Sequence, residues 1–431
     1  MVAFGFYMLL IVSYFLRLPS RLPWLGAIRF DLLLMGLVLI FSFMERKKVA
    51  DHRDHSTKYL WGIVGFVILS LPFVMWPGSV IRSGSVNFLK VVVFYFFTVL
   101  IINNESRLKT LILVFLLCTF FRFLEPAILH ITTGYWGSGA ASIFKGKIQV
   151  LRRLSGAPHD VINPNQLAWV VVSTIPFLYY LGWHGKHYLK ILSAVVASIG
   201  VYVLMLTGSR SGLITLIITL IAILFYGQTK KKFKRVAIGL MILIPVAIVI
   251  SGMLSPDLRT RYLSTFEGGL PGSESAAGRI RGLERGISTL GVRILVGHGL
   301  GTSLETNANI TGEAVISHNL YLEAVQEIGL FGLCLFLLYV RGMWRNLRDA
   351  KTIFRDALPK KHWMEALTKA VQVWIIMDVF YSFTCFGLNS WEWYLFGGIS
   401  VALLRVARQK ESLNAKVEIR QKKQVLIPAT S

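Results

Sequence analysis

The sequence predicts an all-α polytopic membrane protein, on the basis of its composition, the length of its apolar runs and the placement of its basic residues. Hydrophobic residues make up 54% of the 431 residues and charged residues only 16%, whereas a soluble domain of this length needs far more polar surface. The apolar runs reach about 20 residues, the length of a membrane-crossing helix. They lack the period-two alternation typical of a β-barrel strand.

Twelve apolar segments can be placed along the chain. They cover approximately residues 2–16, 24–44, 59–77, 88–103, 110–129, 166–183, 190–207, 211–227, 236–254, 320–340, 365–383 and 391–406. The chain enters the first segment at Val2 without a cleavable-signal pattern, so this run is interpreted as the first crossing. We therefore expect one transmembrane domain over residues 1–406. A basic cytoplasmic tail over residues 407–431 is expected to be poorly ordered.

The net charge of +24 is concentrated in particular loops. Lysine and arginine gather at Arg46–Lys48, Lys230–Arg235, Arg341–Lys361 and Arg405–Lys423. These clusters alternate with basic-poor connections, so the positive-inside rule places the even-numbered connections and both termini in the cytoplasm. The charge therefore does not indicate nucleic-acid binding. The three cysteines lie in apolar runs and show neither a metal-ligand spacing nor a disulfide framework.

The odd-numbered connections then face outward, and two of them are long, at about residues 130–165 and 255–319. From Ser255 to Ser317 the chain carries six arginines and no lysine. Arginine offers a planar fork of donors that can hold phosphate oxygens in pairs and stays charged when desolvated. Arg210, in the short turn between the seventh and eighth segments, and Arg279 are therefore candidate phosphate contacts.

Other outward ionisable residues have simpler interpretations. A solvated helix face explains Arg281, Arg285 and Arg293 as well as ligand contact does. Local pairing or snorkelling at the membrane interface is expected for Arg29 with Asp31 and for Arg122 with Glu125. Asp378 is also placed near the outer end of its segment.

His318 follows the long outward connection directly. Its near-neutral pKa makes it a plausible general base for a sugar hydroxyl, although an interfacial histidine is more often a cap or a satisfied polar residue. Asn319 could orient a substrate or cap the next helix. Gly329 and Gly332, three residues apart, allow a close approach of helices.

Three separated stretches resemble the O-antigen ligase and O-antigen polymerase superfamily of bacterial membrane glycosyltransferases. They are Arg153–Gly156 with Asn163–Ala168; Thr207–Leu213; and Gly278–Arg279 with Val296–Gly301, His318–Asn319, Gly329 and Gly332. Their order, spacing and topology agree with the family. One departure is that Leu283 or its neighbours stand where a tryptophan is often found.

The resemblance implies a GT-C-like, lipid-donor glycosyltransferase with a long periplasmic loop between helices 9 and 10. Such enzymes take a glycan from undecaprenyl pyrophosphate, need neither metal nor cofactor and invert the anomeric centre. By this likeness Arg210 and Arg279 hold the pyrophosphate, with Arg153 as a further candidate contact, and His318 activates the acceptor hydroxyl. Asn319, Gly329 and Gly332 form a supporting motif. The expected location is the bacterial inner membrane, among membrane lipids, with the site facing the periplasm.

The donor chemistry leaves two functions open within the family. A ligase moves a completed chain onto a lipid A-core acceptor, whereas a polymerase moves a growing chain onto a lipid-linked repeat. The twelve segments and the single dominant outer loop favour the ligase. Relatives acting on exopolysaccharide or on proteins remain further alternatives. A polysaccharide or lipid transporter is the alternative of another class, but it should show repeated halves and polar groups at the membrane midplane.

Overall fold

The computed structural model describes residues 2–44, 54–144, 147–183, 185–226, 252, 256–263, 274–315, 318–359, 362–385 and 387–425. These residues form mostly helices and one antiparallel β-hairpin. Within them, four helical stretches are long and apolar enough to cross a membrane, and these are Pro77–Ile101, Glu105–Thr133, His187–Leu206 and Leu320–Ala357. The all-helical membrane class predicted from the sequence agrees with this architecture.

The first half of the chain contributes a series of helices followed by the hairpin. They are α1 (Val2–Leu16), α2 (Leu18–Arg21), α3 (Pro23–Ala27), α4 (Phe30–Met44), α5 (Thr57–Ser70), α6 (Pro77–Ser79), α7 (Ser85–Ile101), α8 (Glu105–Thr133), β1 (Gly137–Phe144) and β2 (Lys147–Leu154). A π-helical segment, Val80–Gly84, joins α6 to α7. The hairpin lies in the long connection expected at about 130–165, and its register pairs Gly137 with Leu154.

The second half contributes the remaining helices. They are α9 (Pro164–Phe177), α10 (His187–Leu206), α11 (Arg210–Tyr226), α13 (Pro256–Leu263), α14 (Glu274–Ser288), α15 (Ser303–Thr311), α16 (Leu320–Ala357), α17 (Trp363–Tyr381) and α18 (Trp391–Val425). Eleven of the predicted apolar segments fall on helices, and the segment at 236–254 lies almost entirely outside the described residues.

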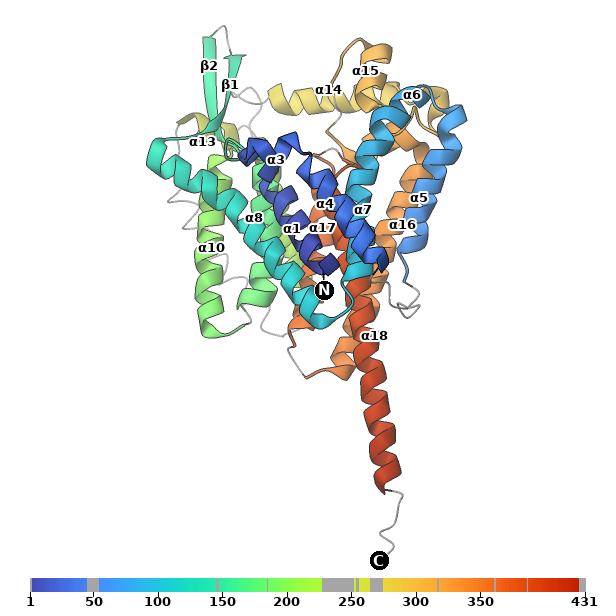
Figure 1. Ribbon diagram of the computed structural model, residues 1–431. Helices are drawn as coiled ribbons and strands as arrows, with labels where there is room; N and C mark the ends of the chain where they lie inside the picture. Colours follow the sequence, from blue (N-terminus) through green and yellow to red (C-terminus); the bar gives the residue numbers. More distant parts are fainter. Residues whose placement is uncertain are drawn as a thin grey trace, which may run out of the picture.

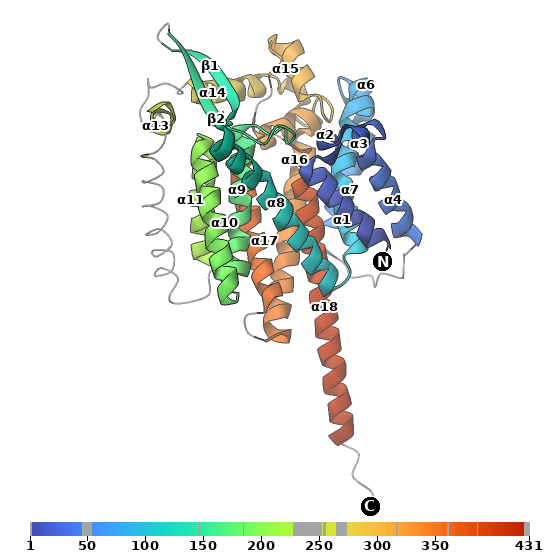
Figure 2. The ribbon, with the colours of Figure 1, turned by 60° about the vertical axis from the view of Figure 1, so that its left-hand side comes forward.

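The long helices form a bundle with a cap at one end (Figures 1 and 2). The cap contains β1, β2, α13, α14 and α15, and α14 lies across the bundle rather than along it. The start of α1 lies toward the opposite end, and α18 projects from that end well beyond its neighbours. The cap thus contains the described parts of the two long connections, which the positive-inside rule predicts on the outer side of the membrane.

Large aromatic side chains pack closely at the centre of the bundle. Trp374 of α17 stacks on Phe396 of α18 with ring centroids 3.8 Å apart, and Trp393 lies edge-on to Trp374 at 5.8 Å. All three are fully buried. Because aromatic pairs combine large apolar area with a preferred geometry, they fix how α17 and α18 approach the cap.

The tenth apolar segment falls on α16, which continues through the basic residues beyond residue 340 to Ala357. Two other expectations were wrong. Residues 407–425 of the tail are not irregular but extend α18. The second segment is interrupted at Ile28 and Arg29, where Arg29 has φ of 51°. Charge marks where an apolar run ends, but it does not stop a helix from continuing into water.

Candidate active site

Arg153 lies on β2 and reaches the end of α10 and the start of α9. Its Nε donates to the carbonyl oxygen of Thr207 at 2.7 Å, and its Nη2 donates to Asn165 Oδ1 at 2.8 Å. Burial, followed by the positive charges of Arg261, Arg279 and Arg210, lowers the pKa of Arg153 to about 9. Arg153 therefore belongs to a group of arginines drawn from four different elements.

The turn between α10 and α11 presents Arg210 to this group. Gly208 has φ of 58°, a left-handed conformation that favours glycine, and a Cβ there would lie 2.9 Å from Leu258. Ser209 Oγ accepts from the backbone N–H of Gly212 at 3.1 Å and so caps the first turn of α11. Arg210 is the first residue of that helix. The short turn expected between the seventh and eighth segments is confirmed, because α10 ends at Leu206 and α11 begins at Arg210.

Arg261 of α13 was not singled out from the sequence. Its Nε donates to the carbonyl oxygen of Gly208 at 2.9 Å. Burial, followed by the charge of Arg210, lowers its pKa to about 10. The sequence did contain a signal for Arg261, because this residue lies in the outward segment that carries arginine and no lysine. We name Arg153, Arg210, Arg261 and Arg279 the arginine cluster.

The arginine cluster brings several like charges together. The positive charge of each arginine disfavours the charged form of its neighbours, and this repulsion contributes to the lowered pKa of Arg153 and of Arg261. A polyvalent anion among them would replace this repulsion by charge-assisted hydrogen bonds. Pyrophosphate has the charge and the multiple oxygens to contact several guanidinium groups at once.

His318 stands immediately before α16 in a strained backbone conformation. Its φ is 52°, which is uncommon for a residue with a side chain and is typical of functional sites. Burial, followed by the charge of Arg279, lowers the pKa of His318. At neutral pH the imidazole is therefore mainly uncharged and able to accept a proton. The positive charge of Arg279 therefore acts on His318, the predicted base.

Asn319 caps the helix that follows His318. Its Oδ1 accepts from the backbone N–H groups of Tyr321 at 3.0 Å and Leu322 at 3.1 Å. The backbone N–H of Leu320 donates to the carbonyl oxygen of Ser382 at 2.9 Å. These bonds fix the chain on the carboxyl side of His318. Of the two roles considered for Asn319, the structure shows the cap.

Gly329 breaks α16 and brings two of the sequence motifs together. Its φ is 65° and its ψ is −177°, so Leu320–Ile328 forms a separate half-helix. The backbone N–H of Leu330 donates to Ile294 at 2.8 Å, and a Cβ on Gly329 would lie 2.1 Å from the carbonyl oxygen of Leu295. The close approach expected at Gly329 is therefore to the loop that precedes α15, not to another helix. A Cβ on Gly332 would instead meet Ile328 of the same helix.

We expect Gly329→Ala to destabilise the fold so strongly that most of the protein no longer folds. A left-handed residue with a Cβ costs about 1–2 kcal/mol before any collision, and here the methyl group would also displace the backbone at Leu295. Thermal unfolding followed by size-exclusion chromatography would measure the effect. Gly36→Ala is the matched control, because a Cβ at Gly36 meets nothing within 4 Å. An unchanged unfolding temperature for Gly329→Ala would contradict this account of the break.

Several other polar residues of the long outward connection have structural partners. His298 is buried, and its backbone N–H donates to the carbonyl oxygen of Gln326 at 2.7 Å, as suits a residue of the glycine-rich turn. Arg285 pairs with Glu313. Arg293 donates to the carbonyl oxygen of Phe73, whereas Arg281 is exposed.

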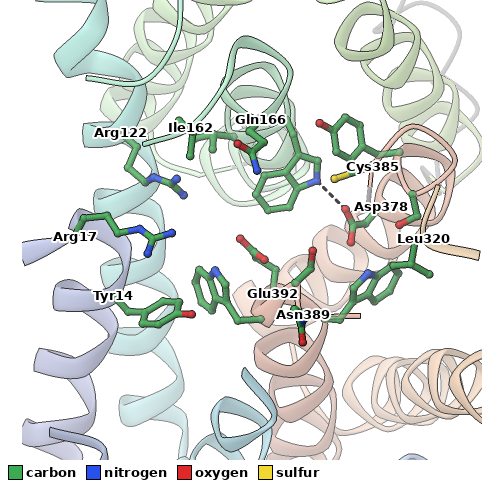
Figure 3. A pocket seen from close by; sticks show the side chains of 17 residues that line it. Tyr14, Arg17, Arg122, Ile162, Gln166, Leu320, Asp378, Cys385, Asn389 and Glu392 are labelled. Atoms are coloured by element: carbon green, nitrogen blue, oxygen red, sulfur yellow. Dashed lines mark hydrogen bonds between the residues drawn. The ribbon is translucent and has the colours of Figure 1, made fainter. Parts of the chain in front are cut away.

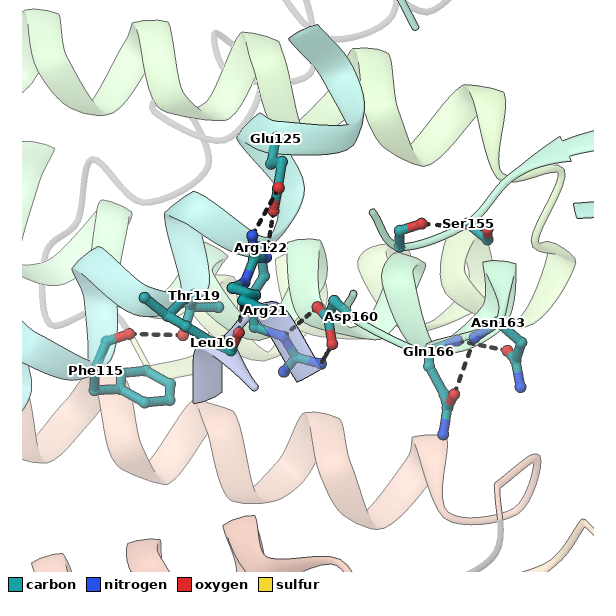
Figure 4. A network of polar contacts seen from close by, with 11 residues as sticks. Leu16, Arg21, Phe115, Thr119, Arg122, Glu125, Ser155, Asp160, Asn163 and Gln166 are labelled. Carbon is teal, nitrogen blue, oxygen red and sulfur yellow. Dashed lines mark hydrogen bonds and ion pairs between the residues drawn. The ribbon is translucent and has the colours of Figure 1, made fainter. Parts of the chain in front are cut away.

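The expected local pair of Arg122 with Glu125 was wrong. Arg122 forms a buried bidentate ion pair with Asp160, with Nε 2.7 Å from Oδ2 and Nη2 3.1 Å from Oδ1. Glu125 pairs instead with Arg21 of α2 (Figure 4). Residues three apart on a helix can meet, but here each side chain faces a different element. The two ion pairs therefore connect α8 to α2 and to the loop that contains Asp160.

Asp31 also bonds to a residue of another element. Ser13 of α1 donates to Asp31 Oδ1 of α4 at 2.5 Å.

A cavity of about 230 Å³ lies among α1, α8, α9, α17 and α18 (Figure 3). Asp378 of α17 faces it and accepts a hydrogen bond from Trp169 Nε1 at 2.7 Å. Gln166 and Leu320 also line it. Gln166 follows the residue that binds Arg153, and Leu320 lies two residues after His318, so the cavity adjoins both parts of the site.

Residues 193–337 match a family model described as O-Antigen ligase. The matched stretch contains Arg210, Arg261, Arg279, His318, Asn319, Gly329 and Gly332, whereas Arg153 precedes it. No curated protein matches the chain. The family match supports the resemblance at the second and third of the three stretches, and the first stretch lies before residue 193.

Proposed function

Because residues 193–337 belong to the O-antigen ligase family, we propose that the protein is a membrane glycosyltransferase of the O-antigen ligase type. The family supports an O-antigen ligase- or polymerase-type function with a lipid-linked glycan and a lipid acceptor. The proposed donor is a glycan on undecaprenyl pyrophosphate, and the proposed acceptor is lipid A-core. The transfer is proposed to be metal-independent and inverting.

The observation that carries this proposal is the arginine cluster beside His318. In the transfer, the bond between the anomeric carbon and the pyrophosphate oxygen breaks, so negative charge develops on the pyrophosphate. Fixed guanidinium groups stabilise that charge more in the transition state than in the ground state. Arg210 and Arg279 are proposed as principal contacts, and Arg153 and Arg261 as supporting ones.

His318 is proposed as the general base. The acceptor hydroxyl loses its proton to the imidazole as its oxygen bonds to the anomeric carbon. Attack on the face opposite the departing pyrophosphate inverts the anomeric configuration. The lowered pKa of His318, caused by burial and by Arg279, keeps the imidazole neutral before this step.

The bundle is proposed to be GT-C-like, with about twelve crossings and the cap facing the periplasm. Two observations support this orientation. The start of α1 lies toward the end opposite the cap, and α18 projects from that end (Figures 1 and 2). The projecting part of α18 includes Arg408, Lys410 and Lys416, as the positive-inside rule requires of a cytoplasmic segment. Both termini are thus proposed to be cytoplasmic, in the inner membrane.

The pH dependence should report the lowered pKa of His318. A base must be unprotonated, so kcat/KM for the donor should decline in acid only below the ordinary histidine pKa of about 6.5. Donor pyrophosphate would counter the charge of Arg279 and raise the pKa of His318. The acidic limb of kcat should therefore lie at higher pH than that of kcat/KM. A kcat/KM that already declines between pH 8 and pH 7 would contradict this assignment.

A deletion strain complemented with this chain or with His318→Ala would test the function, with surface glycans resolved by gel. Loss of all glycan on lipid A-core, with lipid-linked polymer accumulating, would support the ligase. Lipid A-core bearing a single repeat would support the polymerase, which has the same donor chemistry. Unchanged glycans in the deletion strain would contradict both.

A further inference from the structure

The cavity beside the arginine cluster has a lining of mixed character. Five aromatic residues face it, and these are Tyr14, Trp169, Tyr381, Trp391 and Trp393. Their rings come from α1, α9, α17 and α18, so the aromatic part of the lining is drawn from four different helices. A packed apolar core would need only such rings, but this lining also contains charged and amide side chains.

Charged side chains of both signs line the cavity. Arg17 approaches from the end of α1, and in Figure 3 the Glu392 side chain, from the first turn of α18, lies between Arg17 and Asp378. Arg122 lies beside Arg17, but its guanidinium is bound to Asp160. Asn389 and Ser390 add further hydrogen-bonding groups to the Glu392 side. A ligand here would meet both a guanidinium group and carboxyl groups.

The rings that line the cavity are themselves held in place. Trp391 packs edge-on against Phe15 at 4.4 Å and Tyr14 at 5.4 Å between ring centroids. Trp169 is oriented by its hydrogen bond to Asp378. Fixed aromatic faces combined with fixed polar groups suit a ring that has apolar faces and a polar edge, because each kind of surface then meets its complement.

The position of the cavity relates it to the transfer reaction. Tyr381 lines it, and the hydroxyl of Tyr381 donates to the carbonyl oxygen of Asn165 at 3.0 Å. Asn165 in turn accepts from Arg153. Ser382, on another part of the lining, accepts from the backbone N–H of Leu320 next to the His318–Asn319 pair. A group in the cavity would therefore lie beside both the proposed pyrophosphate site and the proposed base.

We propose that this cavity binds a single pyranose ring of the reacting glycans, with Trp391 as a stacking surface and Glu392 as a hydrogen-bond acceptor for its hydroxyl groups. The proposal rests on the proposed function, because it assigns the ring to the donor or the acceptor of that reaction. The volume of about 230 Å³ is smaller than the roughly 300–1,000 Å³ of pockets for drug-sized ligands, which favours one ring over a longer chain.

Saturation-transfer NMR on the purified full chain in detergent would test the binding directly. The probes are the methyl glycosides of glucose, galactose and N-acetylglucosamine. Wild type should give saturation transfer to at least one probe, and Glu392→Gln and Trp391→Ala should each reduce it by about tenfold. Trp24→Ala is the matched control, because Trp24 is exposed and does not line the cavity.

The results separate this proposal from the proposed function. Saturation transfer that is lost in Glu392→Gln but kept in Trp24→Ala would support the cavity site even if the wild-type chain transferred no glycan. In the transfer assay, a raised KM for the acceptor or for the donor in Glu392→Gln would show which substrate supplies the ring. No signal from any probe in wild type, or equal signals in all folded variants, would overturn the proposal.

Discussion

Replacing His318 by alanine is expected to slow glycan transfer by about 10²–10⁴-fold, the usual contribution of a positioned general base. The imidazole lies in the field of Arg279 and has a lowered pKa, so its loss removes the group that accepts the proton. The measurement is the initial rate of transfer by purified protein at saturating donor and acceptor.

Two further variants separate chemistry from structure at this position. His318→Gly fits the left-handed backbone without strain, so it should be as inactive as His318→Ala but no less stable. Asn319→Ala should lose about 1 kcal/mol of stability with the helix cap and keep most of the activity. A His318→Ala protein that transfers glycan within tenfold of wild type would remove His318 from the mechanism.

Arg210→Ala and Arg279→Ala are each expected to reduce transfer by at least about 10²-fold while leaving membrane insertion intact. Each variant removes a positive charge from the site where the leaving pyrophosphate develops its own. Arg210→Lys should also be impaired, because a point charge cannot replace a planar fork of donors. Product formation should be measured at matched protein levels.

Arg281→Ala is the matched control for the arginine variants. Arg281 lies on α14 two residues from Arg279, but its side chain is exposed. The variant should therefore transfer at close to the wild-type rate. Normal product from Arg210→Ala or Arg279→Ala at wild-type protein level would exclude that arginine from the site.

The sequence was sufficient to predict those parts of the fold that local patterns determine. Apolar runs located the helices, and the small residues around Arg210 marked a tight hairpin turn. The pairing of Arg122 with Asp160 could not be predicted in this way, because the two residues are far apart in the sequence. The same holds for the contact of Gly329 with the backbone at Leu295.

The hairpin β1–β2 and the residue Arg261 were missed for different reasons. β1 is mostly glycine, alanine and serine, and β2 mixes four apolar residues with Lys147, Arg152 and Arg153, so neither strand shows a sustained apolar alternation. Arg261 was within the arginine-rich segment but outside the motifs that carry the family resemblance. Its hydrogen bond to Gly208 depends on how α13 packs against the turn before α11.

The central claim is that the arginine cluster and His318 together transfer a glycan from a polyprenyl-pyrophosphate carrier. The most direct test reconstitutes the full chain in lipid nanodiscs with an undecaprenyl-pyrophosphate-linked glycan and lipid A-core. Glycosylated acceptor and released undecaprenyl pyrophosphate are measured together. We predict equal amounts of both products from wild type and neither above background from His318→Ala or Arg210→Ala. Undiminished transfer by both variants, or none by wild type with either lipid A-core or a lipid-linked repeat as acceptor, would contradict the account.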